Sequence, residues 1–426
     1  MAGALPDTIV ALSSGRLPAA IAVIRTSGPA ALAAAQALAG KPPSPRRASL
    51  RSFRDPANGA LIDRGLILSF PGPDTATGEN VVEYQCHGSK AVVAALIAAL
   101  VELPGMRLAE PGEFTRRSLA NGRIDLTQAE GLAELLEAES EAQRISALRR
   151  AEGGLRREVE RWRIALLELS AEAEVAIDYA DEEDGGSAFD PSLRIAALIA
   201  RLDALLSAPR VERMRDGVRL VVAGPPNAGK SSLVNALAGE ARAIVTAIPG
   251  TTRDLVEVPL SIAGIPLTLV DTAGLRESDE EVERIGIALA EREVVRADVL
   301  LWLGTNAEQP AHPRCLLIAS KADRHASFAG HRVSVIDGEG LDSLKDWIAS
   351  QARTLIPSTE QPGLNEREAG LLVECHGALS RVPGLNDPVL IAEELRLARG
   401  ALDRVSGISG VDDLLDALFG RFCLGK

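Results

Sequence analysis

A strand–loop–helix segment at residues 219–237 constrains the fold of this 426-residue chain more than any other feature. The strand-like run Arg219–Ala223 leads into Gly224–Ser231 (GPPNAGKS), and the helical run Ser232–Leu237 follows. The loop has the spacing GxxxxGK[ST], in which glycines let the backbone turn so that its N–H groups surround phosphate oxygens. With 38 glycines and six lysines in the chain, about 0.005 such matches are expected by chance. The segment therefore predicts a nucleotide-binding domain.

Polar side chains in and after this loop fit the binding of a nucleotide together with Mg²⁺. Lys230 adds positive charge beside the β and γ phosphates, and the Ser231 hydroxyl is a suitable ligand for Mg²⁺. Further along, Leu269–Gly274 (LVDTAG) has the pattern of a buried strand that ends at Asp271, where a carboxylate can hold the Mg²⁺ shell. The backbone N–H of Gly274 can contact the γ-phosphate, so that this loop can respond to its loss.

The segments between and after these two anchors bear on hydrolysis of the nucleotide. A threonine hydroxyl in residues 246–254 (TAIPGTTRD) can complete the Mg²⁺ shell, although a plain surface turn is the alternative. Small GTPases place Gln directly after the DxxG segment to orient the attacking water, whereas this chain has Leu275 there. The acidic run 276–286 can bring a carboxylate to the water, or it forms a solvated helix face. The residues alone do not choose among its glutamates.

A third anchor selects the base of the nucleotide. Ser320–Asp323 (SKAD) follows a strand-like run and resembles the [NT]KxD loop of GTPases. The Asp323 carboxylate can accept hydrogen bonds from the guanine N–H and amino groups, which adenine cannot supply, and Lys321 can lie over the ring. Ser320 stands where Asn is usual, but the carboxylate that discriminates guanine is kept. Ser334 begins the next expected base-contact segment.

Three kinds of residue pattern divide the chain into expected domains. Residues 1–118 alternate short apolar segments with Gly/Pro turns around one helical run, Val92–Glu102, which predicts a small α+β domain. Residues 119–213 are rich in Ala, Leu, Glu and Arg with apolar residues three and four apart, which predicts long helices; an example is Ile164, Leu167, Ala171 and Val175. Residues 214–356 alternate strand-like and helical segments, which predicts a parallel sheet with helices on both faces. Helical texture returns in residues 357–426, so we expect the α/β domain to be inserted into one helical domain.

Net charge and cysteine spacing bear on the partners of the protein and on the compartment in which it works. Net charge is −13, which argues against a general nucleic-acid coat. The most basic stretch, Arg144–Arg163, favours a solvated helix face over a tRNA contact. The four cysteines lie too far apart in sequence for a CxxC motif, and we expect a reducing, cytoplasmic setting. The N-terminus lacks a signal-peptide pattern, and the longest apolar stretch, Ala91–Leu103, is short for a membrane span and favours a buried helix.

Motifs along nearly the whole chain resemble the MnmE (TrmE) family of tRNA modification GTPases. In the N-terminal part they are residues 7–11 (DTIVA), 24–28 (IRTSG), 70–73 (FPGP), 77–83 (TGENVVE), 85–88 (QCHG), 111–115 (PGEFT) and 125–130 (DLTQAE). Further on they are residues 250–254 (GTTRD), 271–276 (DTAGLR) and the terminal 422–426 (FCLGK). A phosphate-binding loop recurs in many families, whereas this combination with the terminal CxGK is highly specific.

The resemblance implies an N-terminal α/β domain that binds tetrahydrofolate and dimerises, a helical domain, and an inserted P-loop GTPase domain. It further implies a homodimer that works with a flavoprotein, MnmG (GidA). Such complexes add a carboxymethylaminomethyl or aminomethyl group to the wobble uridine of certain tRNAs, with one-carbon tetrahydrofolate as the methylene source. The implied folate contacts are Arg25, Glu83, Arg123 and Lys426. Arg123 stands where the family commonly has Lys, which keeps the charge but changes its geometry.

The resemblance also implies roles in the GTPase domain. K⁺ would take the place of an arginine finger, with ligands from Asn227, Thr246, Ile248 and Thr251, and Mg²⁺ would be held by Ser231 and Thr252. The catalytic glutamate of the family falls on Glu283. Cys423, the near-terminal family cysteine, is either activated by nearby charge or structural. The implied GTP-binding residues are Asn227, Ala228, Gly229, Lys230, Ser231, Ser232, Thr246, Ala247, Ile248, Pro249, Gly250, Thr251, Thr252, Asp271, Thr272, Ala273, Gly274, Ser320, Lys321, Ala322, Asp323 and Ser334.

Two other classes of function compete with a tRNA-modifying GTPase. A GTP-driven binding switch for ribosome assembly would need an RNA-binding appendage, which is usually basic, and the acidic balance and helical C-terminus speak against it. An ATP-using P-loop enzyme is disfavoured because Asp323 matches guanine. The N-terminal domain and the terminal Cys-Leu-Gly-Lys, which ordinary GTPases lack, favour the tRNA-modifying enzyme.

Overall fold

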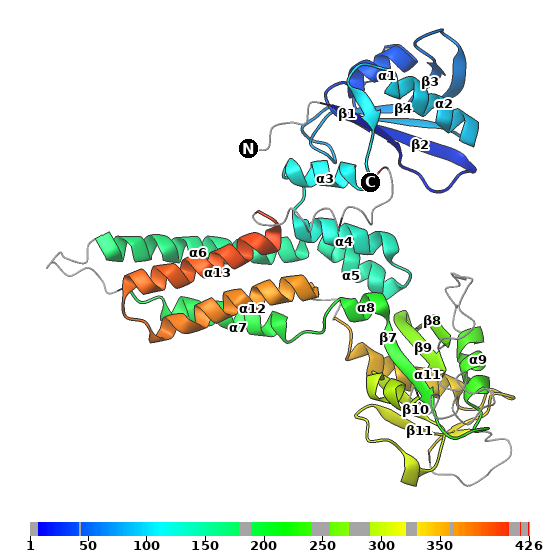
Figure 1. The fold of residues 1–426 in the computed structure, drawn as a ribbon, viewed down its shortest axis with the longest axis vertical. Helices are drawn as coiled ribbons and strands as arrows, with labels where there is room; N and C mark the ends of the chain where they lie inside the picture. The colour runs from blue at the N-terminus through cyan, green and yellow to red at the C-terminus, as the bar shows by residue number, and fades with distance from the viewer. Residues whose placement is uncertain are drawn as a thin grey trace, which may run out of the picture. The chain divides into compact units, whose positions relative to one another are not determined.

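The computed structural model describes residues 7–41, 44–178, 189–240, 256–271, 290–320, 330–357 and 362–408, together with Leu418 and Gly425. The chain forms two compact units, one from residues 1–133 and 406–426 and the other from residues 134–405 (Figure 1). The finer division at residues 118, 213 and 356 stays a prediction of the sequence. Within the described ranges, no helix is both long enough and apolar enough to cross a membrane.

The first unit is built on a six-stranded sheet with the order β3-β4-β5-β2-β1-β6. Only β1 and β6 run parallel, and the other neighbours are antiparallel. The strands are β1 (Thr8–Leu12), β2 (Ala19–Ser27), β3 (Ser49–Arg54), β4 (Leu61–Phe70), β5 (Val81–Gly88) and β6 (Met106–Leu108). The helices are α1 (Ala31–Ala39), α2 (Lys90–Val101), α3 (Glu113–Ala120) and α4 (Leu126–Glu137). The predicted α+β character of this part is confirmed.

Helices α1 and α2 cover one face of this sheet and form its core with alternate strand residues. α2 is the helix predicted at Val92–Glu102, and it begins at Lys90 because the Ser89 side chain caps it by accepting a hydrogen bond from the Val92 N–H. The opposite face carries the remaining strand residues, since successive side chains of a strand alternate between faces. Ile21, Leu50 and Leu66 are exposed there.

Long helices of the second unit pack around one apolar core, as the sequence predicts. They are α6 (Gly154–Asp178), α7 (Ser192–Leu206), α12 (Glu366–Arg381) and α13 (Pro388–Ser406), with the 3-10 turn η3 (Val382–Gly384) between the last two. α5 (Glu141–Ala151) precedes α6. The face of α6 that enters the core carries Leu155, Val159, Trp162, Leu166, Leu169 and Ala173. The apolar recurrence that predicted this helix, Ile164, Leu167, Ala171 and Val175, lies on its exposed face instead.

The arginine-rich stretch 144–163 is only partly the solvated face that the sequence predicts. Arg144, Arg157 and Arg161 are exposed, so the prediction is right for them. It is wrong for Arg150, which is fully buried. Its guanidinium donates to the carboxylate of Glu368, 2.8 Å away, which lies 218 residues further along the chain. A partner so distant in sequence leaves no local pattern by which its burial could be predicted.

A second six-stranded sheet, with the order β12-β11-β10-β7-β9-β8, forms the α/β part of this unit. The strands are β7 (Val218–Ala223), β8 (Val256–Ile262), β9 (Ile265–Asp271), β10 (Val299–Trp302), β11 (Cys315–Ser320) and β12 (His331–Val333). The other elements are α8 (Glu212–Asp216), α9 (Lys230–Glu240), a helical segment at 290–296, the 3-10 turn η2 (Asn306–Glu308) and α11 (Leu341–Arg353). α9 and α11 share the larger apolar core of the sheet.

The sheet differs from the predicted all-parallel arrangement at one edge. β8 runs antiparallel to β9, while the remaining pairs are parallel. The two strands are joined by Ala263 and Gly264, whose φ angles of 50° and 79° are both positive. Two such residues make the tight turn that a hairpin requires, and a hairpin connection forces antiparallel pairing. The doubly covered α/β fold expected for this segment is otherwise confirmed.

Candidate functional site

Most of the predicted nucleotide-binding residues that the structure describes gather at one edge of the second sheet. The parallel strands β7, β9, β11 and β12 all end at this edge. The phosphate-binding loop follows β7, Asp271 ends β9, Ser320 ends β11, and Ser334 follows β12. Ligands of open α/β sheets bind outside the carboxyl ends of the strands, where loops can converge without disturbing the core.

The loop between β7 and α9 has the backbone that a phosphate cradle needs. Gly224 has φ +147°, and a Cβ there would lie 2.5 Å from the carbonyl oxygen of Leu303, so only glycine fits. Asn227 and Gly229 have φ of 60° and 96°. These left-handed positions turn the chain into the first turn of α9, where Ser231 and Ser232 are exposed. Helix N-terminal N–H groups at this point favour an anion.

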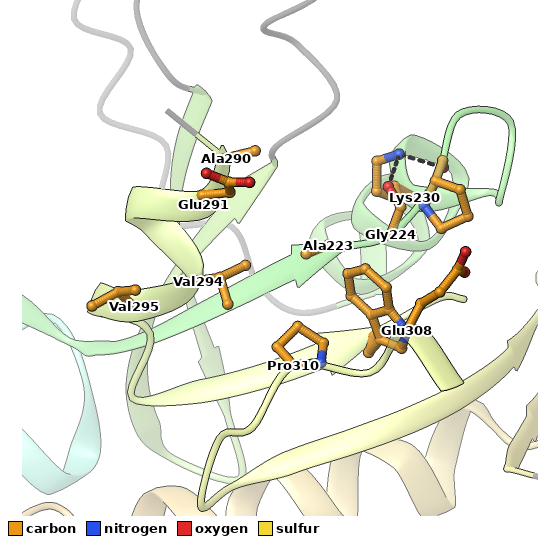
Figure 2. A pocket seen from close by; sticks show the side chains of 11 residues that line it. Ala223, Gly224, Lys230, Ala290, Glu291, Val294, Val295, Glu308 and Pro310 are labelled. Atoms are coloured by element: carbon orange, nitrogen blue, oxygen red, sulfur yellow. Dashed lines mark hydrogen bonds between the residues drawn. The ribbon is translucent and has the colours of Figure 1, made fainter. Parts of the chain in front are cut away.

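Lys230 folds back over this loop. Its ammonium donates hydrogen bonds to the carbonyl oxygens of Gly224, at 3.0 Å, and Pro225, at 2.8 Å, as the dashed lines in Figure 2 show. The side chain is buried, so its charge is concentrated within the loop. A cavity of about 580 Å³ opens beside it and is lined mainly by apolar residues, among them Ala290, Val294, Val295, Trp302 and Pro310 (Figure 2). The arrangement offers a cation and backbone N–H groups to a phosphate chain.

Ser320 is attached to the phosphate-binding loop by a contact that the sequence does not reveal. Its hydroxyl donates a 2.6 Å hydrogen bond to the carbonyl oxygen of Ala228. The residue that departs from the usual Asn therefore still connects the end of β11 to the loop. Asp271 is almost fully buried at the end of β9, where it pairs in register with Val222. Ser334 is fully buried where the chain turns after β12.

The remaining predicted residues of the two sites lie outside the described residues. In the GTPase segment these are Thr246, Ala247, Ile248, Pro249, Gly250, Thr251, Thr252, Thr272, Ala273, Gly274, Glu283, Lys321, Ala322 and Asp323. At the C-terminus they are Cys423 and Lys426.

A second cluster of predicted residues lies on the sheet of the first unit. Arg25 on β2 and Glu83 on β5 are register partners, and their charged groups lie 2.8 Å apart. Both side chains are about one quarter exposed, and the Arg25 guanidinium lies 5.9 Å from the centre of the Phe114 ring. Arg123, in the loop after α3, lies 3.5 Å from Asp74 and is partly exposed. The first two residues therefore contact each other.

The C-terminal end of the chain reaches the same sheet. The Ser13 hydroxyl donates a 2.9 Å hydrogen bond to the carbonyl oxygen of Gly425, which is 412 residues away in sequence. Gly425 has φ +98°, and a Cβ there would collide with the backbone of Leu12. Leu12 is the last residue of β1. Ala11, directly before it, is the register partner of Arg25 on β2. The residue before Lys426 thus lies close to the strand that carries Arg25.

A buried charge network holds the segment 72–80, which leads into the strand that carries Glu83. The guanidinium of Arg117 is almost fully buried and donates to Asp7, Glu79 and Glu113 at 2.8, 3.2 and 2.9 Å. Burial opposes ionisation of Glu113, but hydrogen bonds from Arg107 and Arg117 outweigh it and hold the pKa of that carboxyl below its usual value. Glu79 belongs to the segment 72–80, so the network fixes that segment against α3. No local sequence pattern predicts this network, because its members lie up to 110 residues apart.

Two of the described cysteines, Cys86 and Cys375, lack the environment of a reactive thiol. Burial raises the pKa of the Cys86 thiol to about 11 and that of the Cys375 thiol to about 12. Both groups therefore stay protonated at neutral pH, and neither is a good nucleophile.

Comparison with known families now adds to this geometry. The model described as "GTP-binding protein TrmE N-terminus" matches residues 8–123, and the model described as "MnmE helical domain" matches residues 126–423. The chain belongs to the MnmE family of tRNA modification GTPases. The two MnmE matches together span the first unit, the helices and the α/β part, so the membership covers nearly the whole chain.

Three MnmE proteins are similar to this chain over at least 97% of their own length. The tRNA modification GTPase MnmE of Novosphingobium aromaticivorans is 48% identical over 99% of this chain and 100% of its own. That of Sphingopyxis alaskensis is 50% identical over 95% of this chain and 100% of its own. That of Rhizorhabdus wittichii is 50% identical over 99% and 97%. The resemblance predicted from the sequence motifs is therefore confirmed, and the chain is a GTPase of the MnmE type.

Proposed function

We propose that this chain hydrolyses GTP to drive modification of the wobble uridine of tRNA. In this proposal a one-carbon tetrahydrofolate contributes to a 5-carboxymethylaminomethyl or aminomethyl group. The chain acts as a homodimer in the cytoplasm, together with a flavoprotein of the MnmG (GidA) type. Family membership supplies the enzyme class, and the two residue clusters described above support the finer assignment.

One observation carries the proposal: the phosphate-binding loop, Asp271 and Ser320 meet at the carboxyl edge of one sheet. Lys230 is placed to compensate the charge of the β and γ phosphates, which concentrates as the terminal phosphate departs. Asp323, directly after the Ser320 segment, is assigned to guanine. Glu283 is assigned to orienting the attacking water, because Leu275 cannot do so.

The donor set suits the two cations of the proposal. Ser231 in the first turn of α9 and Asp271 at the end of β9 offer oxygen ligands of the kind that Mg²⁺ prefers, and Thr252 is assigned with them. Asn227 is exposed in the loop and is assigned to K⁺, with Thr246, Ile248 and Thr251. When bound, these cations neutralise negative charge on the phosphates during hydrolysis. We further propose that two GTPase domains meet to complete the K⁺ site.

The first unit supports a folate site on the face of its sheet away from α1 and α2. Arg25 and Glu83 lie on this face, and cationic and carboxylate groups suit the glutamate tail and the pterin N–H groups of a folate. Gly425 lies against Leu12 and Ser13, next to the strand that carries Arg25, which supports the assignment of Lys426 to the same site. Arg123 is assigned as a further cation.

The same face supports the proposed homodimer. Ile21, Leu50 and Leu66 are exposed there among the charged groups. Large apolar side chains gathered on one exposed sheet face are typical of a protein interface. The dimer face and the folate residues would then share one surface.

Competition binding tests the nucleotide part of this proposal. A fluorescent guanine nucleotide bound to the full chain should be displaced by GTP but not by ATP at the same concentration. Lys230→Ala should weaken binding at least about tenfold, because it removes a charge-assisted contact. Lys345→Ala is the matched control, since that lysine pairs with Asp342 on α11. Displacement by ATP, or unchanged binding by Lys230→Ala, would contradict the proposal.

A further inference from the structure

Helix α5 bridges two parts of the second unit, the helical part and the α/β part. Its first turn meets the α/β part, and its last turn is enclosed by helices and connections of the bundle. Its contacts include the two chain segments that lead into and out of the nucleotide-binding part.

The first turn of α5 is completed by the β8–β9 hairpin. A helix leaves its first N–H groups without partners inside the helix. The Ser140 hydroxyl accepts from the Gln143 N–H at 3.3 Å, and the carbonyl oxygen of Gly264 accepts from the Ala142 N–H at 3.3 Å. The Ala142 side chain also packs on the apolar core of the α/β part. The hairpin turn therefore serves as part of the cap of α5.

Gln143 joins this turn to the strand that precedes the phosphate-binding loop. Its Oε1 accepts from the N–H groups of Ser140, at 2.7 Å, and Glu139, at 2.9 Å. Its Nε2 donates to the carbonyl oxygen of Met214, at 2.9 Å. Met214 is buried in α8, four residues before β7 begins. The side-chain amide of Gln143 therefore connects the first turn of α5 to α8, the helix that leads into β7.

The other end of α5 is held as firmly in the helical part. Arg150 donates to the Glu368 carboxylate and to the carbonyl oxygen of Gly363, at 2.8 and 2.6 Å, and all three groups are buried. Next to them, the Val211 N–H donates to the carbonyl oxygen of Leu364, at 3.0 Å, which joins the entering and leaving chain segments. α5 is therefore anchored at both ends and cannot follow one part without moving against the other.

The hairpin reaches from α5 to the nucleotide site. β8 and β9 pair along their whole length, with Ile262 opposite Ile265 beside the turn and Val256 opposite Asp271 at the other end. Paired backbone therefore runs without interruption from Asp271 to the turn at Gly264.

We propose that α5 transmits the nucleotide state from the β8–β9 hairpin to the helical part, and that Gln143 is a positioning residue, because its bond to Met214 holds the first turn of α5 in place beside the hairpin. This inference rests on the proposed function, because it takes the Asp271 end of the hairpin as part of the nucleotide site. Gln143 itself touches neither nucleotide nor substrate.

Gln143→Glu breaks the bridge from the first turn of α5 to Met214 of α8 with little other change. A carboxylate has the shape of the amide and keeps the acceptor that Ser140 and Glu139 use, but it cannot donate to Met214. Ser140→Ala is the matched control, since it weakens the cap of α5 and leaves the Gln143 bridge to α8 in place.

Hydrogen exchange of the full chain, with and without a non-hydrolysable GTP analogue, tests the proposal. In the wild type and in Ser140→Ala, the analogue should slow exchange in both residues 256–271 and residues 140–150. In Gln143→Glu the first segment should still respond, while the response of the second should fall about fivefold, as expected for loss of one hydrogen bond. A merely local destabilisation would speed exchange equally with and without the analogue.

Two other outcomes would overturn the inference, and a third would overturn the proposed function. A wild type whose residues 140–150 do not respond to the bound analogue overturns the inference, and so does a Gln143→Glu variant that responds as the wild type does. Failure of the analogue to bind at all, measured separately by fluorescence, overturns the proposed function instead.

Discussion

Removing the charge of Arg150 should destabilise the helical part strongly. Arg150 and Glu368 are both fully buried, and the pair is joined at 2.8 and 3.1 Å. Arg150→Met has similar length but leaves the Glu368 carboxylate in the core facing an apolar group. Breaking a buried pair in this way costs about 3–5 kcal/mol. That is a large share of the roughly 5–15 kcal/mol by which a typical protein is stable.

A second substitution separates the cost of the unpaired charge from the cost of lost packing. Glu368→Gln removes the charge but keeps an acceptor for the Asn365 N–H, with which Glu368 forms the capping box of α12 at 2.9 Å. Added to Arg150→Met, it should restore about 2 kcal/mol, because a neutral amide is much cheaper to bury than a carboxylate. The remaining loss reflects the unpaired carbonyl oxygen of Gly363, the lost ion pair between Arg150 and Glu134, which lie 3.1 Å apart, and altered packing.

Trp162 provides a probe of this part alone. It is buried in the core of the helices, while the other two tryptophans of the chain, Trp302 and Trp347, belong to the α/β part. Urea unfolding would therefore be followed by fluorescence in a Trp302→Phe, Trp347→Phe background. A loss below about 1 kcal/mol for Arg150→Met, or a further loss on adding Glu368→Gln, would refute this account of the buried pair.

Other predictions concern the two proposed sites and the N-terminal charge network. GTP hydrolysis should be faster in K⁺ than in Na⁺ at equal ionic strength, and equal rates would remove the K⁺ site from Asn227. Glu283→Ala should slow single-turnover hydrolysis about 100-fold and spare GTP binding, whereas an unchanged rate would end its assignment. Arg25→Ala should weaken binding of 5-formyltetrahydrofolate about tenfold in calorimetry, and unaltered affinity would mean that the folate site lies elsewhere. The pKa of Glu113 is held below its usual 4.5, so its contribution to stability is complete at neutral pH. That contribution should be lost as pH falls below about 4.5, which acid unfolding of Glu113→Gln beside the wild type can check.

The fold could be predicted where the governing contacts are local. The phosphate-binding loop at Gly224–Ser231 was predicted from the spacing of a few neighbouring residues. The helix at Val92–Glu102 was predicted in the same way, from a local apolar run. The antiparallel strand β8 was missed, although Gly264 between two apolar runs is a hairpin signal. The exposed stripe at Ile164 and Leu167 shows a different limit, because a helix with two apolar faces does not reveal which one enters the core.

The candidate sites were predictable as residue types at given spacings, but not as contacts. Lys230 was expected to serve phosphate, and its hold on the loop carbonyls follows only from the folded backbone. The hydrogen bond from Ser320 to Ala228 joins residues 92 apart. Arg25 and Glu83 were expected only from the family resemblance, as folate contacts, and the sheet register makes them partners. Side-chain networks of this kind depend on tertiary neighbours that no local pattern encodes.

The most direct test of the central claim is nucleoside mass spectrometry of tRNA. A bacterial strain that lacks its own family member would receive this chain, or Lys230→Ala, together with the cognate flavoprotein. The account predicts that the 5-carboxymethylaminomethyl or aminomethyl uridine returns with the wild-type chain and not with Lys230→Ala. Absence of the modified uridine with the wild-type chain, or equal recovery with both, would contradict it.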